Sequence, residues 1–486
     1  MKLRRTKSLI LTCLIISSIV LSAYVWMSEE LWPKGYNFFI GLKNNPSVRR
    51  IFYSDVYSIP MENLSRPEKI VVTKGEERSV FYNSDASFEN INKPVSAFLS
   101  GVLKDEAVVL NRGTVPIEEW KNVLRNDEIL DTRSLYVEFS LEYSPTLFAH
   151  MIGIKNTWIG KDIHSLKEFI IAPVGEGTKD VLFYAKGGDD LIYKYLINYE
   201  NKNEITKAID NGIFDAGTTY SYSFELNLDK NSQGIGTGVK QKVFIDSMVI
   251  MSSNSTTVPV IYGENPFEAE FADRESLLGH FQYAAGAPKH YTDYSGVEYF
   301  VENYSHLKLH PNGLIEYVAD TEGGGISLPE SAATVYEALN KSIEFSENIW
   351  RSVVGDVPFS VLVTSDLFEN DEGNYKFTLD YYYEGKLVTT ALSGDNFEPM
   401  NHAVEIDVKN GKIVGYRHFF RRYQTASQII CTPQIEALDN IYERFNDREE
   451  EIFINDVYLS YIENGTNSDK APVWCAEIEG SDSVVY

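Results

Sequence analysis

The chain has 486 residues and a formal net charge of −26 at pH 7, because 70 acidic residues outnumber 44 lysines and arginines. A surface this acidic repels phosphate backbones and anionic headgroups, which argues against nucleic-acid binding and against a basic patch docking on a membrane. With 43% hydrophobic residues, the chain has the material for two to four folded domains, so it is not a disordered tail.

The first 27 residues predict a membrane anchor. Residues 1–7 hold four basic residues and no acidic one, and residues 8–27 follow without a charge. At about 1.5 Å per residue, a helix of twenty residues spans the roughly 30 Å hydrocarbon core of a bilayer. The basic flank favours a cytoplasmic start. We therefore expect a single-pass protein of the cell membrane with a cytoplasmic tail at 1–7, an anchor at 8–27, a linker at 28–50 and an extracellular remainder.

A cleaved signal peptide is the alternative for this segment, because Leu21–Ala23 is similar to a small-residue cleavage site. The apolar run is long for a signal peptide and ends in Tyr24 and Trp26, which favour the membrane interface, so the uncleaved anchor is preferred. Ser18 and Ser22 lie four residues apart and form a face on which a second transmembrane helix could approach closely. They are the candidate interaction face of the anchor.

Residues 51–180 predict an N-terminal α/β domain. Segment 115–125 predicts a helix, because Pro116 suits a first turn and apolar residues from Ile117 to Leu124 share one face. Apolar or alternating runs predict short strands at residues 69–73, 79–83, 134–143 and 169–173, with another at 181–185 just beyond a boundary that the sequence leaves indistinct.

Residues 181–322 predict a central domain rich in strands. Partial alternation indicates strands at residues 220–228, 239–251 and 258–262. The three glycines in residues 231–238 are similar to a nucleotide-binding loop. However, no Lys-Ser/Thr pair follows them, and a strand comes next where a helix would be needed. We expect a flexible connection there and no bound cofactor.

Residues 291–317 are crowded with Tyr, His, Glu and Asp and predict a meander. Its strands are expected at residues 297–303, 305–310 and 314–319. Pro-Asn-Gly at 311–313 predicts the last hairpin turn, because proline presets the second turn position and glycine supplies a left-handed residue.

The same meander predicts where its two histidines point. In a strand, His306, Lys308 and His310 share one side while Leu307 and Leu309 share the other. The leucines should be buried, so we expect both histidines in solvent beside a lysine, which is a poor setting for a cation. The sequence also lacks HExxH and closely spaced Cys/His/Asp sets, so no metal site is predicted.

Residues 323–486 predict a C-terminal α+β domain. Helices are expected at residues 327–345, with a buried stripe at Ala332, Val335, Tyr336, Leu339 and Ile343, and at residues 432–447. Strands are expected at residues 357–364, 374–392, 402–420, 452–463 and 471–480, with Asn410-Gly411 as a hairpin turn. Cys431 and Cys475 form a possible disulfide outside the cell, with buried free thiols as the alternative.

Signatures of catalysis are missing from the sequence. It contains no G-x-S-x-G elbow, no Walker loop and no Cys-His pair with a spacing that would suggest a catalytic dyad. A pair of carboxylates for glycoside hydrolysis could come from the acids near the meander, but solvated strand faces explain those acids better. They are Asp293, Glu298, Glu302, Glu316 and Asp320. We predict no catalytic residue.

Two sets of residues carry a resemblance to a known family. The first set is Phe281, Tyr291, Gly296, Tyr299, Leu309, Asn312, Gly313, Glu316 and Tyr317. The second set is Asn410-Gly411, Tyr416, Arg417, Tyr461, Pro472 and Trp474. With the anchor, the length and the order of units, these residues make the chain similar to the YycH family, and residues 323–486 resemble YycI.

The resemblance implies a fold and a function. The fold is α+β: one N-terminal transmembrane helix, then an extracytoplasmic multi-domain region of mostly antiparallel sheets with packed helices. The function is that of a non-catalytic regulator in Gram-positive bacteria, which acts with a YycI-like partner on the sensor histidine kinase WalK and so on cell-wall metabolism.

Two alternatives remain open. A binding module for a wall polymer or peptide would need an exposed aromatic groove, for which Tyr381–Tyr383 is the most suggestive cluster. In the plainer interpretation at least Tyr382 belongs to the core. A wall hydrolase would need two acids that converge in a cleft, and is the less favoured alternative.

Overall fold

The structure is a computed structural model. It describes residues 66–83, 85, 87–125, 133–175, 177–187, 191–213, 219–230, 242–267, 274–283, 288–320, 324–328, 335–364, 373–394, 396–445 and 451–479. The chain divides into the compact units Met1–Ser58 and Ile59–Tyr486, and every described residue belongs to the second. The predicted tail, anchor and linker at 1–50 lie outside the described residues. Within the described ranges, no helix has the length and apolar character needed to cross a bilayer.

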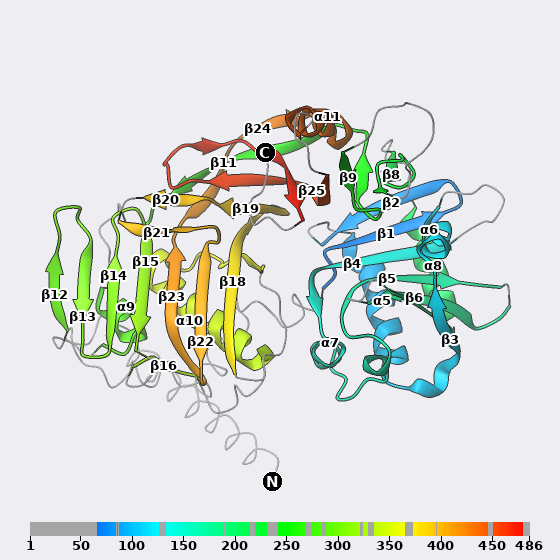
Figure 1. Cartoon of the computed structure of the whole chain (residues 1–486), viewed down its shortest axis with the longest axis horizontal. Coiled ribbons are helices and arrows are strands. Elements are labelled where there is room, and N and C mark those ends of the chain that lie inside the picture. The colour runs from blue at the N-terminus through cyan, green and yellow to red at the C-terminus, as the bar shows by residue number, and fades with distance from the viewer. Residues whose placement is uncertain are drawn as a thin grey trace, which may run out of the picture. The chain divides into compact units, whose positions relative to one another are not determined.

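An antiparallel sheet of seven strands forms the first part of this unit (Figure 1). Its spatial order is β2-β1-β4-β5-β6-β7-β3. The strands are β1 (Lys69–Lys74), β2 (Glu77–Tyr82), β3 (Val109–Val115), β4 (Arg133–Tyr143), β5 (Leu166–Pro173), β6 (Asp180–Lys186) and β7 (Ile192–Asn198). The five strands predicted between residues 69 and 185 are confirmed. The sheet continues through β6 and β7, across the boundary predicted between residues 180 and 181.

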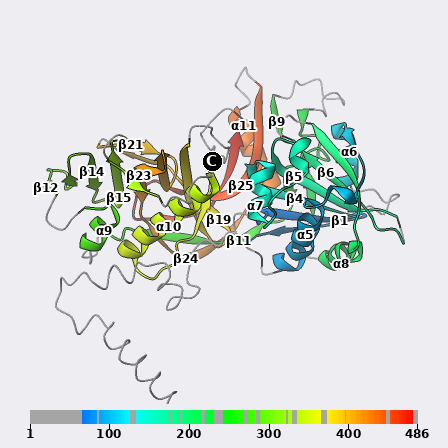
Figure 2. The ribbon, with the colours of Figure 1, turned by 90° about the horizontal axis from the view of Figure 1, so that it is seen from below.

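Helices lie on both faces of this sheet (Figure 2). On one face, α5 (Phe88–Val102) and α8 (Lys202–Gly212) cover Ile70 and Val72; on the other, α6 (Ile117–Leu124) covers Val71. A further helix, α7 (Pro145–Met151), follows β4. The predicted helix α6 is confirmed, and its Trp120 and Leu124 are buried. Helix α5 was missed although its buried residues recur every three or four positions, because Pro94 stands inside it.

The described residues between 220 and 252, which are 220–230 and 242–252, form shorter strands than the alternation predicted. The strands are β8 (Tyr220–Tyr222), β9 (Val243–Ile245) and β10 (Ile250–Ser252), and β8 pairs with β10. The strand predicted at 220–228 breaks into turns that bring Asn227 to a positive φ of 58°, and a turn at Asp246 separates β9 from β10. The predicted strand at 258–262 is confirmed within β11 (Thr256–Glu264).

A second large sheet contains thirteen strands of the described residues. Its main path runs β12 (Lys289–Thr292), β13 (Glu298–Val301), β14 (Ser305–Leu309), β15 (Leu314–Ala319), β23 (Lys412–Phe419), β22 (Val404–Lys409), β18 (Asn374–Tyr383), β19 (Lys386–Thr390), β25 (Ile452–Glu463) and β27 (Val473–Ile478). Off this path, β16 (Ile326–Ser327), β17 (Val361–Val363) and β9 pair with β23, β18 and β25. Its pairs are antiparallel except those of β25 with β19 and with β9. Because strands from 243 to 478 share it, the sheet also crosses the boundary predicted between 322 and 323.

Three helices belong to this second part. Helices α9 (Arg274–His280) and α10 (Val335–Val354) lie on one face of the large sheet, and α11 (Gln434–Phe445) follows β24 (Arg422–Cys431) (Figure 2). The predicted stripe on α10 is confirmed for Val335, Tyr336, Leu339 and Ile343, which are buried, while Ala332 lies outside the described residues. The remaining strands are β20 (Leu392–Gly394), β21 (Phe397–Met400) and β26 (Asp469–Lys470), and β24, β11 and β26 form a three-stranded sheet. The predicted class, α+β with mostly antiparallel sheets and packed helices, is confirmed.

Candidate functional site

The predicted hairpin turn of the meander is confirmed at β14–β15. The backbone N–H of Gly313 donates to the carbonyl of His310 (3.0 Å), and Gly313 has a φ of +96°. Leu307 and Leu309 are buried, as the alternation predicted. Gly313 therefore supplies the left-handed residue that the Pro-Asn-Gly turn requires, as the sequence predicted.

Charged side chains form a row across four strands beside this turn. The register places Lys308, Glu316, Arg417 and Glu405 directly opposite one another on β14, β15, β23 and β22. Glu316 lies 3.4 Å from Lys308 Nζ and 3.3 Å from Arg417 Nε, and Arg417 Nη1 donates to Glu405 (3.1 Å). Opposite charges alternate along the row, so each carboxylate is neutralised by its neighbours.

The prediction that His310 faces solvent is wrong. Its side chain is buried, its Nε2–H donates to Glu316 (2.9 Å), and its ring meets Phe397 edge-on at 5.6 Å. The strand ends at Leu309, so the alternation that governs Leu307 and Leu309 no longer fixes the next side chain. His306 remains on the strand, half-buried, and burial together with Lys308 lowers its pKa.

Glu316 was expected on a solvated face and is instead buried. Burial by itself raises the pKa of a carboxyl group, but the hydrogen bond from His310 and the nearby cations lower the pKa of Glu316. Asp293 closes its own turn by accepting the N–H groups of Ser295 (2.9 Å) and Val297 (3.0 Å). The carboxylate of Asp293 therefore accepts hydrogen bonds within a turn, whereas the carboxylate of Glu316 pairs with cationic side chains.

The other predicted acids near the meander serve separate local contacts. Glu298 accepts from His290 Nε2 (3.1 Å) on the neighbouring strand β12. Glu302 precedes β14 and is half-buried, and Asp320 follows β15 and is exposed, so both lie at the open end of this hairpin. The contacts of Asp293, Glu298 and Glu316 are those of a turn and of ion pairs in the sheet.

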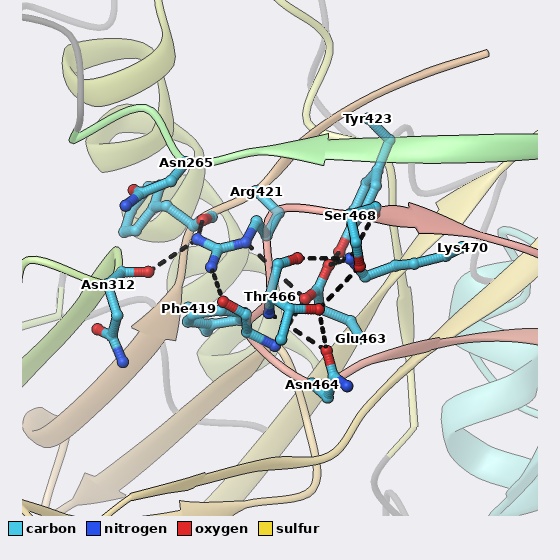
Figure 3. Close-up of polar contacts among 12 residues, drawn as sticks. Asn265, Asn312, Phe419, Arg421, Tyr423, Glu463, Asn464, Thr466, Ser468 and Lys470 are labelled. Atoms are coloured by element: carbon cyan, nitrogen blue, oxygen red, sulfur yellow. Dashed lines mark hydrogen bonds and ion pairs between the residues drawn. The ribbon is translucent and has the colours of Figure 1, made fainter. Parts of the chain in front are cut away.

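A buried charge cluster lies next to the meander turn (Figure 3). Its members are Arg421, between β23 and β24, Glu463, the last residue of β25, and Lys470 on β26. The relative exposures of the three residues are 1%, 0% and 6%. Glu463 lies 3.9 Å from Arg421 Nε and 3.3 Å from Lys470 Nζ, so one carboxylate faces two cations. Buried charges of this kind require close partners.

Arg421 connects three separate backbone segments. Its Nη1 donates to the carbonyls of Asn312 (2.8 Å) and Phe420 (2.9 Å), and its Nη2 donates to the carbonyl of Gly465 (2.9 Å). The guanidinium also lies 4.2 Å from the centre of the Phe419 ring. The side chain thus ties the meander turn to the corner between β23 and β24 and to the loop that follows β25.

Most other hydrogen bonds of the cluster involve the loop that follows β25. Glu463 accepts the N–H of Gly465 (2.7 Å) and the hydroxyl of Tyr423 (3.2 Å). Lys470 Nζ donates to the carbonyls of Thr466 (2.8 Å) and Ser468 (3.1 Å). With these bonds the cluster fastens the fold around the turn. The sequence offered little signal for it, because its three charged residues come from three elements.

A second polar network lies in the core of the large sheet. His418 is fully buried, its Nε2 lies 2.9 Å from the Tyr381 hydroxyl and its Nδ1 lies 2.7 Å from the Tyr416 hydroxyl. Burial lowers the pKa of His418 well below its usual value, so the ring is neutral. Because the Tyr381 hydroxyl donates to the carbonyl of Phe419 (3.0 Å), the proton of the imidazole belongs on Nε2.

This network corrects the interpretation of Tyr381–Tyr383. The core member is Tyr381 and not Tyr382, which is half-buried and donates its hydroxyl to Asn83 (2.9 Å). Tyr383 is also half-buried, and its hydroxyl lies 2.9 Å from Thr425 Oγ1. The three rings therefore have different surroundings and do not form the aromatic groove that a polymer-binding module would need.

The remaining predicted site residues have mixed outcomes. Cys431 and Cys475 are buried free thiols, which is the second of the two predicted possibilities, and they do not form a disulfide in the structure. Ser18, Ser22 and the glycine-rich loop at 231–238 lie outside the described residues. Within the described residues, no group of three or more His, Cys, Asp or Glu side chains could hold a metal ion.

Comparison with known proteins gives a likeness of fold. No family model matches the sequence, and no curated protein matches it. Among solved structures, the crystal structure of YycH from Bacillus subtilis is similar, with a TM-score of 0.52 and 13% sequence identity. The match covers 88% of this chain and 97% of that chain. The chain therefore has a YycH-like fold.

Proposed function

We propose that the protein is a membrane-anchored, extracytoplasmic regulator of a WalK-type sensor histidine kinase. The observation that carries the proposal is the likeness to YycH, which extends over 88% of this chain and so includes both sheets. The uncharged run at residues 8–27 supports anchoring in the cell membrane, with the tail at 1–7 in the cytoplasm. A YycI-like protein is the expected second partner.

The proposed mechanism is a shift of the kinase between conformational states. A regulator that binds two states of a kinase with unequal affinity changes their populations without catalysing a reaction. The buried charge cluster supports a non-catalytic role, because Arg421, Glu463 and Lys470 use their charged groups in hydrogen bonds to backbone groups of the protein itself. The sign of the effect on the kinase is a separate outcome of the test.

Crosslinking in native membranes tests the proposal directly. The full-length protein, crosslinked and purified under denaturing conditions, should carry a histidine kinase and a YycI-like protein that mass spectrometry identifies. Deleting the gene should also change the output of a cell-wall reporter controlled by that kinase. Recovery of neither partner, with an unchanged reporter, would overturn the regulator proposal.

The anchor face provides the sharper experiment. Replacing Ser18 and Ser22 with leucine should weaken co-purification of the kinase and change reporter output, because larger side chains keep the helix backbones apart. Ser17→Leu is the matched control, since Ser17 points about 100° away from Ser18 on a helix. If all variants insert equally into the membrane and the double variant signals as the wild type does, the proposal that Ser18 and Ser22 form an interaction face is refuted.

A binding module for a wall polymer is the second candidate. The observation that favours it is a group of exposed tyrosines on the meander: Tyr291, Tyr294 and Tyr304 expose 53%, 108% and 57% of their surface. Tyr291 also stacks on Tyr299, with ring centres 4.8 Å apart. Sedimentation with purified cell walls tests this candidate, and Tyr294→Ala should reduce binding if a glycan stacks there. Equal sedimentation of the variant and the wild type would dismiss it.

A further inference from the structure

Four charged residues form a second row across the seven-stranded sheet. The register places Lys69, Glu138 and Glu168 opposite one another on β1, β4 and β5. Lys186 ends β6 and follows Ala185, which pairs with Phe169 on β5, and the four strands lie side by side in Figure 1. Lys69 Nζ lies 3.0 Å from Glu138, and Lys186 Nζ lies 3.6 Å from Glu168. The two glutamates thus meet in the middle of the row, where like charges directly opposite are destabilising.

Tyr136 lies between these two glutamates on the same face of the sheet. Its hydroxyl oxygen is 2.9 Å from Glu138 Oε2 and 3.1 Å from Glu168 Oε2. Both carboxyl groups are nearly covered, with side-chain exposures of 13% and 12%. A tyrosine hydroxyl has one proton, and an ionised carboxylate only accepts hydrogen bonds. Two ionised carboxylates would therefore leave one of these close contacts without a proton.

We propose that Glu168 holds a proton at neutral pH and that the three side chains form a chain in which Glu168 donates to the Tyr136 oxygen and Tyr136 donates to ionised Glu138. Both short contacts are then hydrogen bonds. The chain removes one of two opposed negative charges from a covered position. The site thus binds a proton, and its occupancy depends on pH. This inference does not depend on the proposed regulatory role.

The surroundings of the two carboxyl groups select Glu168 as the protonated member. Lys69 is closer to Glu138 than Lys186 is to Glu168, so the ionised form is better paired at Glu138. Burial raises the pKa of Glu168, as do Asp246 and Glu138, against the lowering effect of Lys186 and Lys167.

The pKa of Glu138 moves in the opposite direction. Burial alone would raise it, but Lys69, Lys167 and the hydrogen bonds from Lys69 and Tyr136 lower it. Burial and both glutamates raise the pKa of Tyr136 well above its usual value, so the tyrosine keeps its proton. The pair therefore divides into one acid and one carboxylate.

Loss of this proton should loosen the segment that covers the row. Described residues of this segment, which lies between 220 and 252, pack on Tyr136, whose ring meets Tyr222 edge-on at 5.9 Å, and Met248 and Ile250 join the same apolar cluster. The turn of this segment carries Asp246, whose carboxylate accepts the N–H of Met248 (2.8 Å). A charge on Glu168 would add to the charges of Glu138 and Asp246.

The sign of the pH effect follows from the raised pKa of Glu168. The folded state keeps this proton above the ordinary glutamate pKa of 4.5, so stability from this group is full below that value. Stability is lost as pH rises from there through the folded pKa. Rising pH should therefore increase opening of the segment at 243–252.

Infrared spectroscopy and hydrogen exchange of the full-length protein in lipid nanodiscs test the proposal. At pH 7 the protein carrying Glu68→Gln, which removes the band of a second carboxyl group with a raised pKa, should show the carbonyl band of a protonated carboxylic acid. Adding Glu168→Gln should remove that band while keeping the fold, because an amide N–H replaces the acid proton. Exchange of amides in 243–252, corrected for intrinsic chemistry, should be slower at acid than at alkaline pH in the wild type, by about tenfold for each pH unit over which only the folded state holds the proton. It should be independent of pH in Glu168→Gln.

Two further variants keep the result interpretable. Burial raises the pKa of Glu68 to about 7, so Glu68→Gln is the control that removes its band and leaves the Glu168 band in place. Glu138→Gln should weaken the Glu168 band, because the charge of Glu138 is one of the groups that raise the pKa of Glu168, after burial and Asp246. In the Glu68→Gln background, a spectrum without a protonated band would overturn the proposal. So would a band that survives the addition of Glu168→Gln to that background, which would place the proton on Glu138.

Discussion

Replacing Arg421 with methionine should lower the free energy of unfolding by about 4 kcal/mol. Methionine has a similar length, but it leaves Glu463 with Lys470 as its remaining cation and removes the donor from the carbonyls of Asn312 and Gly465. Removal of one partner of a buried ion pair costs about 3–5 kcal/mol, and each hydrogen bond to a charged group contributes about 1.5–3 kcal/mol. These terms overlap, and the sum is a large part of a typical stability of about 5–15 kcal/mol.

Urea denaturation of the full-length protein in detergent, followed by tryptophan fluorescence, measures this loss as a lower transition midpoint. Arg422→Met is the matched control, because the neighbouring arginine is 45% exposed and pairs with Glu264 at the surface. An exposed ion pair contributes about 0–1 kcal/mol, so the control should stay close to the wild type. Equal effects of the two substitutions would refute the account of the buried cluster.

A double-mutant cycle separates the ion pair from the backbone hydrogen bonds. Glu463→Gln removes the carboxylate charge and keeps the shape, and its combination with Arg421→Met should cost less than the sum of the single changes, by about 0.5–3 kcal/mol. Full additivity would mean that Arg421 and Glu463, 3.9 Å apart, do not stabilise one another.

Three other features give independent predictions. Gly313→Ala should lower the free energy of unfolding, measured by urea denaturation, by about 1–3 kcal/mol, because an added Cβ there would lie only 2.8 Å from a guanidinium nitrogen and the φ is +96°. Burial alone would lower the pKa of His402, but its contact with Asp380 (2.7 Å) raises that pKa above 6.5. The stability that protonated His402 contributes is therefore full below pH 6.5 and is lost as pH rises. Asp380→Asn should abolish that loss, and an NMR titration of His402 checks the pKa. Burial raises the pKa of Cys431 and of Cys475, to about 12 for Cys475, so thiol reagents should label both slowly in the native protein and fully, without reductant, in urea.

Each of these predictions has a control or a contrary outcome. Gly153 has a φ of +79° and nothing within 4 Å of an added Cβ, so Gly153→Ala should cost less than Gly313→Ala; the reverse order would contradict the steric argument. An unaltered histidine titration in Asp380→Asn would mean that another group sets the pKa of His402. Protection of the cysteines in urea until reductant is added would reveal a disulfide.

Much of the fold could be predicted because local chemistry decides it. Asn410 and Gly411 adopt φ values of 50° and 71°, the left-handed pair that such a hairpin turn requires. The buried stripe of α10 follows from the spacing of apolar residues along a helix. Strands that alternate, such as β14 and β15, were found for the same reason.

The extent of the sheets could not be predicted from these local signals. Strand β24 was not expected, and nearly all of its residues from Arg422 to Ile430 are exposed or half-buried, so no hydrophobic period marks it. Its identity as a strand depends on pairing with β11 at residues 256–264, more than 150 positions away. Pairings of this kind place strands from several predicted domains in one sheet.

The sequence alone determined the hairpin turns at 311–313 and 410–411, the amphipathic helices α6, α10 and α11, the α+β class and the resemblance to YycH, because each depends on neighbouring residues or on motif order. The tertiary structure decided the burial of His310, the placement of Tyr381 in the core, the free thiols and both charge clusters. Arg421 and Asn312 are 109 residues apart, and Glu168 and Tyr136 are 32 apart, yet each pair shares a hydrogen bond. The environment of a charged group is set by the residues that the fold places around it, and no local sequence pattern encodes contacts between residues so far apart in the chain.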